Sequence, residues 1–277
     1  MWLTVIDRLG APGDALITAN VIRGIKNKYP QLKINCITPH PELIKYDPLI
    51  DSINNRETFY SFDSSYWELV NRKDSSTNVV EHSLGKLSIG TSKYKSCFYL
   101  SEQECAWGKR QTEGLRKPVF SINTKSKELV KTWPDDEWKA LVPELLRVGD
   151  VIQLGDEREP KYKGVKSFAG NCTMRESAAI MNHTDLFIGP DSLLMHIANG
   201  LDIPSVILFG GSRPVQSLGY EQNINLSSSP DCSPCWIHDG FEKCEHKVKC
   251  MNNIKQSHVL DAVSSLLSIE PQIYQNN

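Results

Sequence analysis

The chain has 277 residues, of which 40% are hydrophobic and 23% charged, and its formal net charge is −2 at pH 7. These values are typical of a globular protein with two ordinary domains or one large one. They give no whole-chain basic footprint for nucleic acid, and no apolar run is long enough to predict a membrane span. The N-terminal segment MWLTVIDRLG lacks the basic region and cleavage site of a signal peptide, so we expect a cytoplasmic protein.

The N-terminal segment predicts a strand, a helix and a second strand. Residues 3–6 form an apolar run of strand type, and a loop rich in turn residues follows at 7–13. Apolar residues spaced by four predict a helix that opens at Asp14, and residues 34–37 predict the next strand. The glycines of the loop do not make the G-x-G-x-x-G dinucleotide fingerprint. Asp is a common N-cap residue, so capping is one interpretation of Asp14.

Residues 54–116 are rich in Ser, Asn, Lys and Thr and show weak periodicity. We expect the rest of a small N-terminal sheet there, with loops that face an acceptor and a linking helix that begins at Ser101. From residue 118 to residue 209, segments of strand type and helix type alternate. This alternation predicts an α/β domain with a mainly parallel sheet.

Polar residues mark the last βαβ unit of this second domain. Asp191 and Ser192 follow an apolar run and open a helix, where unpaired N–H groups and the helix dipole favour an anion. His196 is spaced so that it can face the same cleft. Two other interpretations stay open: Asp191 could cap its helix, and His196 could be a core histidine.

Eight cysteines are many for a cytoplasmic protein, and four of them are crowded with the spacing C-x2-C-x8-C-x5-C. In a reducing compartment this clustering favours a metal over disulfides, and four thiolates favour zinc or iron. A shell of four cysteines leaves no open position, so the metal would be structural. Two disulfides, free thiols, or His238 or His246 in place of one ligand are the alternatives. The expected ligands are Cys232, Cys235, Cys244 and Cys250.

Several of these segments resemble glycosyltransferase family 9, which contains the ADP-heptose:lipopolysaccharide heptosyltransferases and the autotransporter heptosyltransferases. The main match is Asp-Ser-x-x-Met-His-x-Ala at 191–198, followed by Pro-x-x-x-Leu-Phe-Gly at 204–210. Leu193 stands where the usual form of the motif has glycine. The other matches are Gly13-Asp14, Tyr29-Pro30, Asp47-Pro48-x-x-Asp51, Lys131-x-Trp133-Pro134 and the cysteine segment.

The resemblance implies a GT-B-like α/β fold, in which two Rossmann-like domains with parallel sheets face a cleft. We expect residues 1–115 to form a reduced N-terminal domain on the acceptor side. Residues 116–277 would form the nucleotide-sugar-binding domain, with the cysteine loop at 232–250 beside the donor cleft. The final helix, which starts near Ser257, would pack back on the N-terminal domain.

The resemblance also implies an enzyme, an inverting glycosyltransferase that moves a heptose-like sugar from a nucleotide diphosphate donor to an acceptor hydroxyl. Asp14 would be the catalytic base, and Lys131 would contact the diphosphate of an ADP-heptose-like donor. Bound iron is a property of the autotransporter members, which agrees with a metal at the cysteines. No magnesium is required if lysine and the helix dipole offset the diphosphate charge. The expected donor-binding residues are Gly13, Lys131, Asp191, Ser192 and His196.

Two other functions are compatible with the sequence. A sugar-nucleotide epimerase of similar shape would act on the donor itself and need no acceptor. A catalytically inactive, metal-bearing binding module would keep the fold without transfer, and Leu193 and the short N-terminal half favour it. The sequence does not identify the acceptor, which could be a glycan, a protein or another hydroxyl compound, and it leaves open whether the chain is a homo-oligomer.

Overall fold

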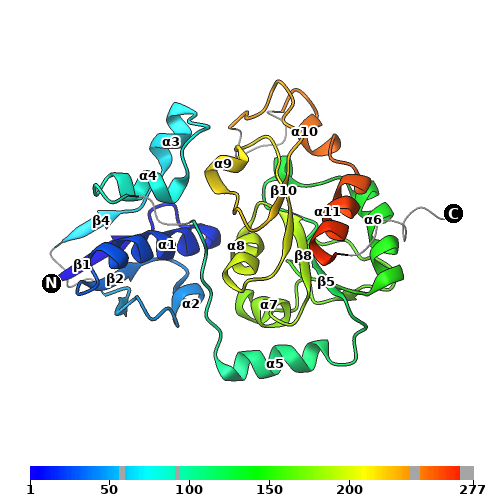
Figure 1. Cartoon of the computed structure of the whole chain (residues 1–277), viewed down its shortest axis with the longest axis horizontal. Coiled ribbons are helices and arrows are strands. Elements are labelled where there is room, and N and C mark those ends of the chain that lie inside the picture. Colours follow the sequence, from blue (N-terminus) through cyan, green and yellow to red (C-terminus); the bar gives the residue numbers. More distant parts are fainter. Residues whose placement is uncertain (56–59, 91–93, 237–243, 269–277) are drawn as a thin grey trace.

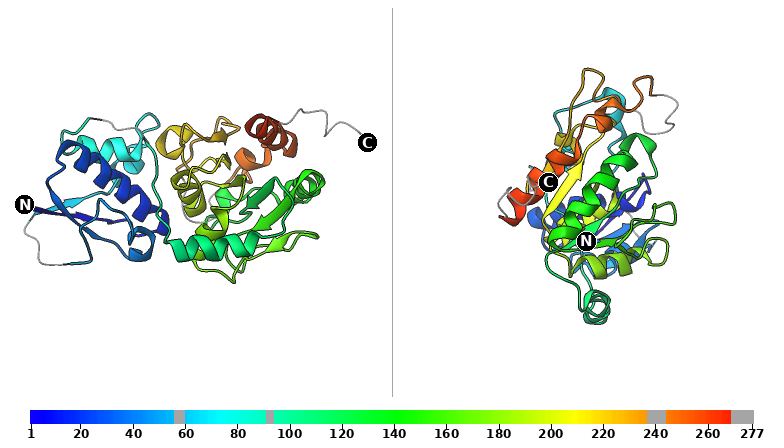
Figure 2. Two further views of the ribbon diagram at one scale, coloured as in Figure 1. Left: turned by 60° about the horizontal axis from the view of Figure 1, so that its bottom comes forward. Right: turned by 90° about the vertical axis from the view of Figure 1, so that its right-hand side faces the viewer.

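The computed structural model describes residues 1–55, 60–90, 94–236 and 244–268 and contains two β-sheets (Figure 1). Every strand pairing in both sheets is parallel. Figures 1 and 2 show the sheets in two lobes, with the linking helix along one side of their junction. The parallel α/β arrangement predicted from the alternating pattern is therefore present.

The first sheet is small and has the strand order β3-β2-β1-β4. Its strands are β1 (Trp2–Ile6), β2 (Lys33–Ile37), β3 (Ser52–Ile53) and β4 (Ser61–Asp63). Helix α1 (Pro12–Lys28) connects the first two strands and begins two residues before the predicted start, because Pro12 is tolerated where its missing N–H has no partner to lose. Three short helices complete this lobe: α2 (Pro41–Ile44), α3 (Trp67–Arg72) and α4 (Val79–Gly85).

The link between the lobes is α5 (Glu102–Thr112), whose predicted start is confirmed. The Ser101 hydroxyl accepts from the Glu104 amide, and the Glu104 carboxylate accepts from the Ser101 amide. This capping box satisfies two backbone donors that would otherwise lack partners.

The second sheet is larger and has the strand order β10-β9-β8-β5-β6-β7. Its central strands are buried on both faces, as continuous apolar runs predict for a covered parallel sheet. The strands are β5 (Val119–Ile122), β6 (Asp150–Gln153), β7 (Lys166–Ser167), β8 (Leu186–Pro190), β9 (Ser205–Leu208) and β10 (Ile224–Leu226). The helices are η1 (Leu129–Lys131), α6 (Asp135–Val148), α7 (Met174–Met181), α8 (Leu193–Gly200), α9 (Val215–Leu218), α10 (Lys249–Asn252) and α11 (Gln256–Leu267).

The prediction that the final helix packs on the N-terminal domain is wrong. Helix α11 packs against α6, β9 and β10, and lies beside α6 in Figure 1. Its buried residues Val259 and Val263 join an apolar cluster that contains Trp138. An amphipathic stripe shows that a helix needs an apolar partner, but it does not show which surface supplies it.

Helices from both lobes meet at the junction. Helix α1 contacts α8, α2 contacts α7, and α5 contacts α7. Over the parts of the chain described above, no helix combines the length and apolar character needed to cross a membrane.

The contact between α5 and α7 depends on Gly108. A Cβ atom added to Gly108 would lie 2.0 Å from the backbone oxygen of Ala179, so the helices would have to separate. We expect Gly108→Ala to lower the free energy of unfolding by about 1–3 kcal/mol, as overpacking does. Gly85→Ala is the matched control, because nothing lies within 4 Å of a Cβ there. Urea denaturation of both variants tests this, and equal effects would contradict it.

Candidate functional site

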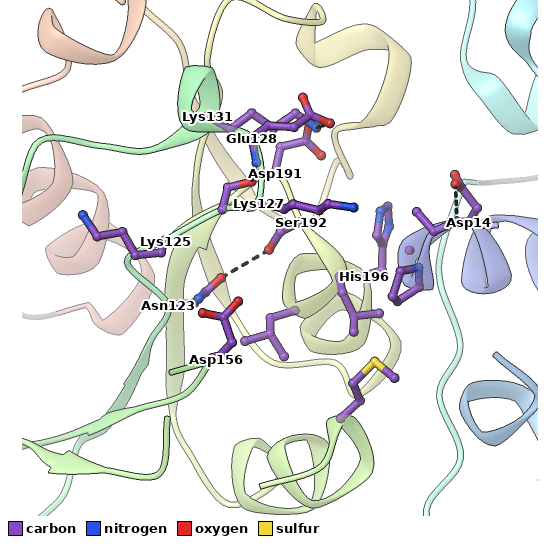
Figure 3. A pocket seen from close by; sticks show the side chains of 18 of the residues that line it. Asp14, Asn123, Lys125, Lys127, Glu128, Lys131, Asp156, Asp191, Ser192 and His196 are labelled. Carbon is purple, nitrogen blue, oxygen red and sulfur yellow. Dashed lines mark hydrogen bonds and ion pairs between the residues drawn. The ribbon is translucent and has the colours of Figure 1, made fainter. Parts of the chain in front are cut away.

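A cavity of about 740 Å³ lies between the two lobes. On the first lobe it is lined by the loop after β1 and the first turn of α1. On the second lobe it is lined by the segments that follow β5, β6 and β8, through residues 123, 125–128, 131, 155–158, 191–194 and 196 (Figure 3). Ligands of parallel α/β sheets bind outside the carboxyl ends of the strands, and this cavity lies at those ends.

Asp14 enters the cavity from the first turn of α1 and is only 9% exposed. Its Oδ1 accepts a hydrogen bond from the Tyr66 hydroxyl at 2.5 Å, and its Oδ2 accepts one from the Ala11 amide at 3.1 Å. The second bond satisfies a donor at the helix N-terminus, so Asp14 does contribute to capping. Burial raises the pKa of Asp14, and the Tyr66 hydrogen bond opposes that rise. A buried carboxyl group with a raised pKa in a cleft is a candidate proton acceptor.

Asp191 and Lys131 form a buried ion pair on the opposite wall. The Lys131 Nζ lies 3.3 Å from Oδ2 of Asp191 and 3.7 Å from Oε1 of Glu128. Burial by itself would raise the pKa of Asp191, but nearby cationic groups, Lys131 first among them, together hold that pKa below its ordinary value. Lys131 is therefore fixed in place beside the start of α8 and differs from an ordinary solvated lysine.

Ser192 is the N-cap residue of α8, but its side chain does not cap the helix. Its hydroxyl instead donates to Oδ1 of Asn123 at 3.3 Å, across the cavity wall to the segment after β5 (Figure 3). Leu193 begins α8 and also lines the cavity. The wall at this end of α8 therefore combines a hydroxyl, an amide and an apolar side chain.

His196 and Gly13 lie where α8 meets α1. A Cβ atom on Gly13 would lie 3.1 Å from Cδ2 and 3.3 Å from Nε2 of His196, a tight contact that the ring would have to relieve by a small shift. The Nδ1 atom of His196 lies 2.7 Å from the Tyr220 hydroxyl. Burial lowers the pKa of His196 to about 4, so the ring is neutral at pH 7. His196 thus has a packing role and also lines the cavity.

The structure brings together all six predicted residues of the transfer site, in one cavity lined by both lobes. These residues are Gly13, Asp14, Lys131, Asp191, Ser192 and His196.

Other residues of the site had no assigned role in the sequence. Tyr66 and Arg213 belong to none of the sequence motifs, yet Arg213 stacks on the Tyr66 ring with 4.8 Å between guanidinium carbon and ring centroid. Glu159 accepts hydrogen bonds from the Thr124 and Lys125 amides and orders the segment after β5. Lys125 and Lys127, which the sequence treats as ordinary solvated lysines, line the cavity.

The four clustered cysteines are free thiols, and Cys250 is the buried one. Among the described residues, no three His, Cys, Asp or Glu side chains are close enough to hold a metal, so the predicted four-cysteine site is not assembled there. His238 and residues 237–243 lie outside the described residues. Two of the sulfurs do have backbone donors: the Gly211 amide lies 3.1 Å from Sγ of Cys250, and the Val248 amide lies 3.3 Å from Sγ of Cys244. Burial nevertheless raises the pKa of the Cys250 thiol.

Known proteins of similar sequence are heptosyltransferases. The model of glycosyltransferase family 9 (heptosyltransferase) matches residues 72–245. Lipopolysaccharide heptosyltransferase 3 of Escherichia coli (strain K12) is 26% identical over 166 residues, which are 53% of this chain and 48% of that protein. The autotransporter heptosyltransferase BAHTCr of Citrobacter rodentium (strain ICC168) is 27% identical over 133 residues, 44% of this chain and 32% of that protein. The chain spans about half the length, or less, of these curated relatives.

Solved structures show the same architecture. E. coli ADP-heptose lps heptosyltransferase II has a TM-score of 0.73 at 17% identity, over 97% of this chain and 99% of that chain. The dodecameric, iron-containing heptosyltransferase TibC of enterotoxigenic E. coli, in complex with ADP-D-beta-D-heptose, has a TM-score of 0.78 at 16% identity, over 97% of this chain and 76% of that chain. These matches confirm the predicted GT-B-like fold. Since the family model also covers most of the sequence, the chain belongs to glycosyltransferase family 9.

Proposed function

We propose that this chain is an inverting glycosyltransferase that moves a heptose-like sugar from an ADP-heptose-like donor to an acceptor hydroxyl. The observation that carries the proposal is the pair of buried features on opposite walls of one cavity. Asp14 lies on the first lobe, and the Lys131–Asp191 pair lies on the second, beside the N-terminus of α8. Transfer needs a base for the acceptor and stabilisation of the departing diphosphate. The first wall offers the base, and the second wall offers a cation and a helix N-terminus that can stabilise the diphosphate.

In the proposed reaction Asp14 takes the proton of the acceptor hydroxyl while the oxygen of that hydroxyl attacks the anomeric carbon of the donor sugar. The bond from that carbon to the diphosphate breaks on the opposite face, which inverts the configuration. The raised pKa of Asp14 makes it a stronger base than an exposed aspartate, and the Tyr66 hydroxyl orients it.

The donor side of the proposed site is built on Lys131 and α8. An ammonium group has three N–H donors, so Lys131 can keep its pairing with Asp191 and still donate to a phosphate oxygen. Neutral His196 would contribute a hydrogen bond and no charge. We accordingly assign the acceptor to residues 1–115 and the nucleotide-sugar to residues 116–277. The similarity to heptosyltransferases, one of them in complex with ADP-D-beta-D-heptose, supports the choice of donor.

A transfer assay with ADP-heptose and a panel of glycan, protein and other hydroxyl acceptors tests the proposal. Release of ADP that requires an acceptor supports transfer. An isomerised donor without an acceptor would instead identify an epimerase, and the absence of any nucleotide-sugar binding would identify an inactive module.

Asp14→Asn tests the base. We expect transfer to fall by about 10²- to 10⁴-fold, as loss of general-base catalysis does, with donor affinity by calorimetry retained. The same variant should melt at a higher temperature at pH 7. Because the folded-state pKa of Asp14 is raised, its contribution to stability is present below the unfolded pKa and is lost as the pH rises through the folded pKa. Exposed Asp136→Asn is the control, and a fully active Asp14→Asn would contradict the assignment.

Tyr66→Phe tests how Asp14 is tuned. The Tyr66 hydrogen bond lowers the pKa of Asp14, so its loss should move the acidic limb of the kcat/KM profile to higher pH. Tyr60→Phe, at an exposed tyrosine, should leave the profile unchanged. An acidic limb that stays in place or moves to lower pH in Tyr66→Phe would show that Asp14 does not control it.

We also propose that the clustered cysteines hold one structural zinc or iron. Four cysteine sulfurs are a donor set that both metals accept, and the structural neighbour TibC is iron-containing. Elemental analysis should find about one metal per chain, lost in Cys235→Ser and Cys250→Ser but retained in Cys105→Ser, and chelation should lower the melting temperature. Metal-free protein, or equal loss in Cys105→Ser, would refute the site.

A further inference from the structure

Arg213 is a buried charge without a hydrogen-bond partner among the described residues. It lies in the loop between β9 and α9, lines the cavity and is 9% exposed. Its Nε atom is buried with no hydrogen-bond partner, and no residue that the structure describes accepts a hydrogen bond from its guanidinium group. Its close contact with the described part of the chain is the stacking on the ring of Tyr66, at 4.8 Å from the centroid.

Arg175 is a buried arginine with a structural role, and it provides a comparison for Arg213. Its guanidinium is similarly buried, but it donates to both carboxylate oxygens of Glu104. It also donates to the backbone oxygens of Glu42 and Tyr99. Burying a cation that lacks such partners destabilises the folded protein, so the burial of Arg213 without them needs another explanation.

The position of Arg213 indicates that explanation. Its charge acts on Asp14 from one lobe and on Asp191 from the other, and lowers the pKa of both carboxyl groups without bonding to either. Stacking on Tyr66, which itself bonds Asp14, holds the planar group at the junction of the lobes. The donors of Arg213 are therefore available in the cavity, next to the proposed reacting atoms.

We propose that Arg213 binds an oxyanion of a ligand, a phosphate or a carboxylate, at the junction between the acceptor and donor sides. A guanidinium group offers a planar fork of N–H donors that matches such groups in two-point contact. Tyr66 acts as the platform that orients the fork. The identity of the ligand rests on the proposed function, which allows two sources: the diphosphate of the donor, or an acidic group on the acceptor.

Calorimetry with the whole chain separates these sources. In the first arm ADP and AMP are titrated into wild type, Arg213→Gln, Arg213→Lys and the control Arg147→Gln, whose arginine is exposed and paired with Glu144. In the second arm inorganic phosphate is titrated into free protein and into protein saturated with ADP. Thermal melting verifies that each variant is folded, and Arg213→Lys decides the matter if Arg213→Gln does not fold.

If the donor supplies the oxyanion, Arg213→Gln should weaken ADP binding by roughly ten- to a hundredfold, with AMP little changed. If the acceptor supplies it, ADP should bind normally, but phosphate should bind the ADP-saturated wild type and not Arg213→Gln. Arg213→Lys should give an intermediate loss in either case, because it keeps the charge without the fork.

The proposal would be overturned if Arg213→Gln bound ADP and phosphate as Arg147→Gln does in both arms. If ADP binds no form of the protein, the proposed donor is wrong, and the phosphate titration into free protein then tests Arg213 alone. Phosphate binding there that depends on Arg213 would support the site, and phosphate binding that does not depend on it would refute it.

Discussion

The approach of α1 to α8 determines the geometry of the whole site. At Gly13 there is no side chain, so the His196 ring packs close to the backbone of α1. Tyr220 fixes the ring from the other side through its hydroxyl. Because each helix begins just after the carboxyl end of a strand, this one contact brings the loop ends of two separate sheets to the same cavity. A carboxylate that begins one helix then faces the N-terminus of the other.

Each buried charge of the cavity is accommodated in a different way. Asp14 receives two hydrogen bonds and has a raised pKa, whereas Asp191 is neutralised by Lys131. Within the described residues, Arg213 has an aromatic face and no acceptor. Burial of unpaired charge opposes folding, so such residues persist where a ligand or a reaction requires them. Arg175, by contrast, uses its donors within the fold.

Sequence patterns predicted the elements well, because periodicity and capping are local properties. The longer strands, the start of α5 and the residues at strand ends could be placed, and the carboxyl ends of parallel strands necessarily meet at one edge. The short strands β3, β4, β7 and β10 could not, because two or three residues carry too little periodicity. Long-range pairing could not be placed. Arg213 and Tyr66 meet only because the lobes face each other, and the partner of α11 was predicted wrongly because its apolar stripe would suit more than one surface. The spacing of the cysteines likewise gives their order along the chain, but it does not give the distances between their sulfur atoms.

The loop after β9 joins the cysteine segment to the cavity. The Gly211 amide points at the sulfur of Cys250, and the Gly211 carbonyl accepts from the Cys235 amide at 2.6 Å. Arg213 follows two positions later on the same stretch of backbone. The backbone that holds the two cysteines is therefore the same backbone that places the guanidinium group in the cavity.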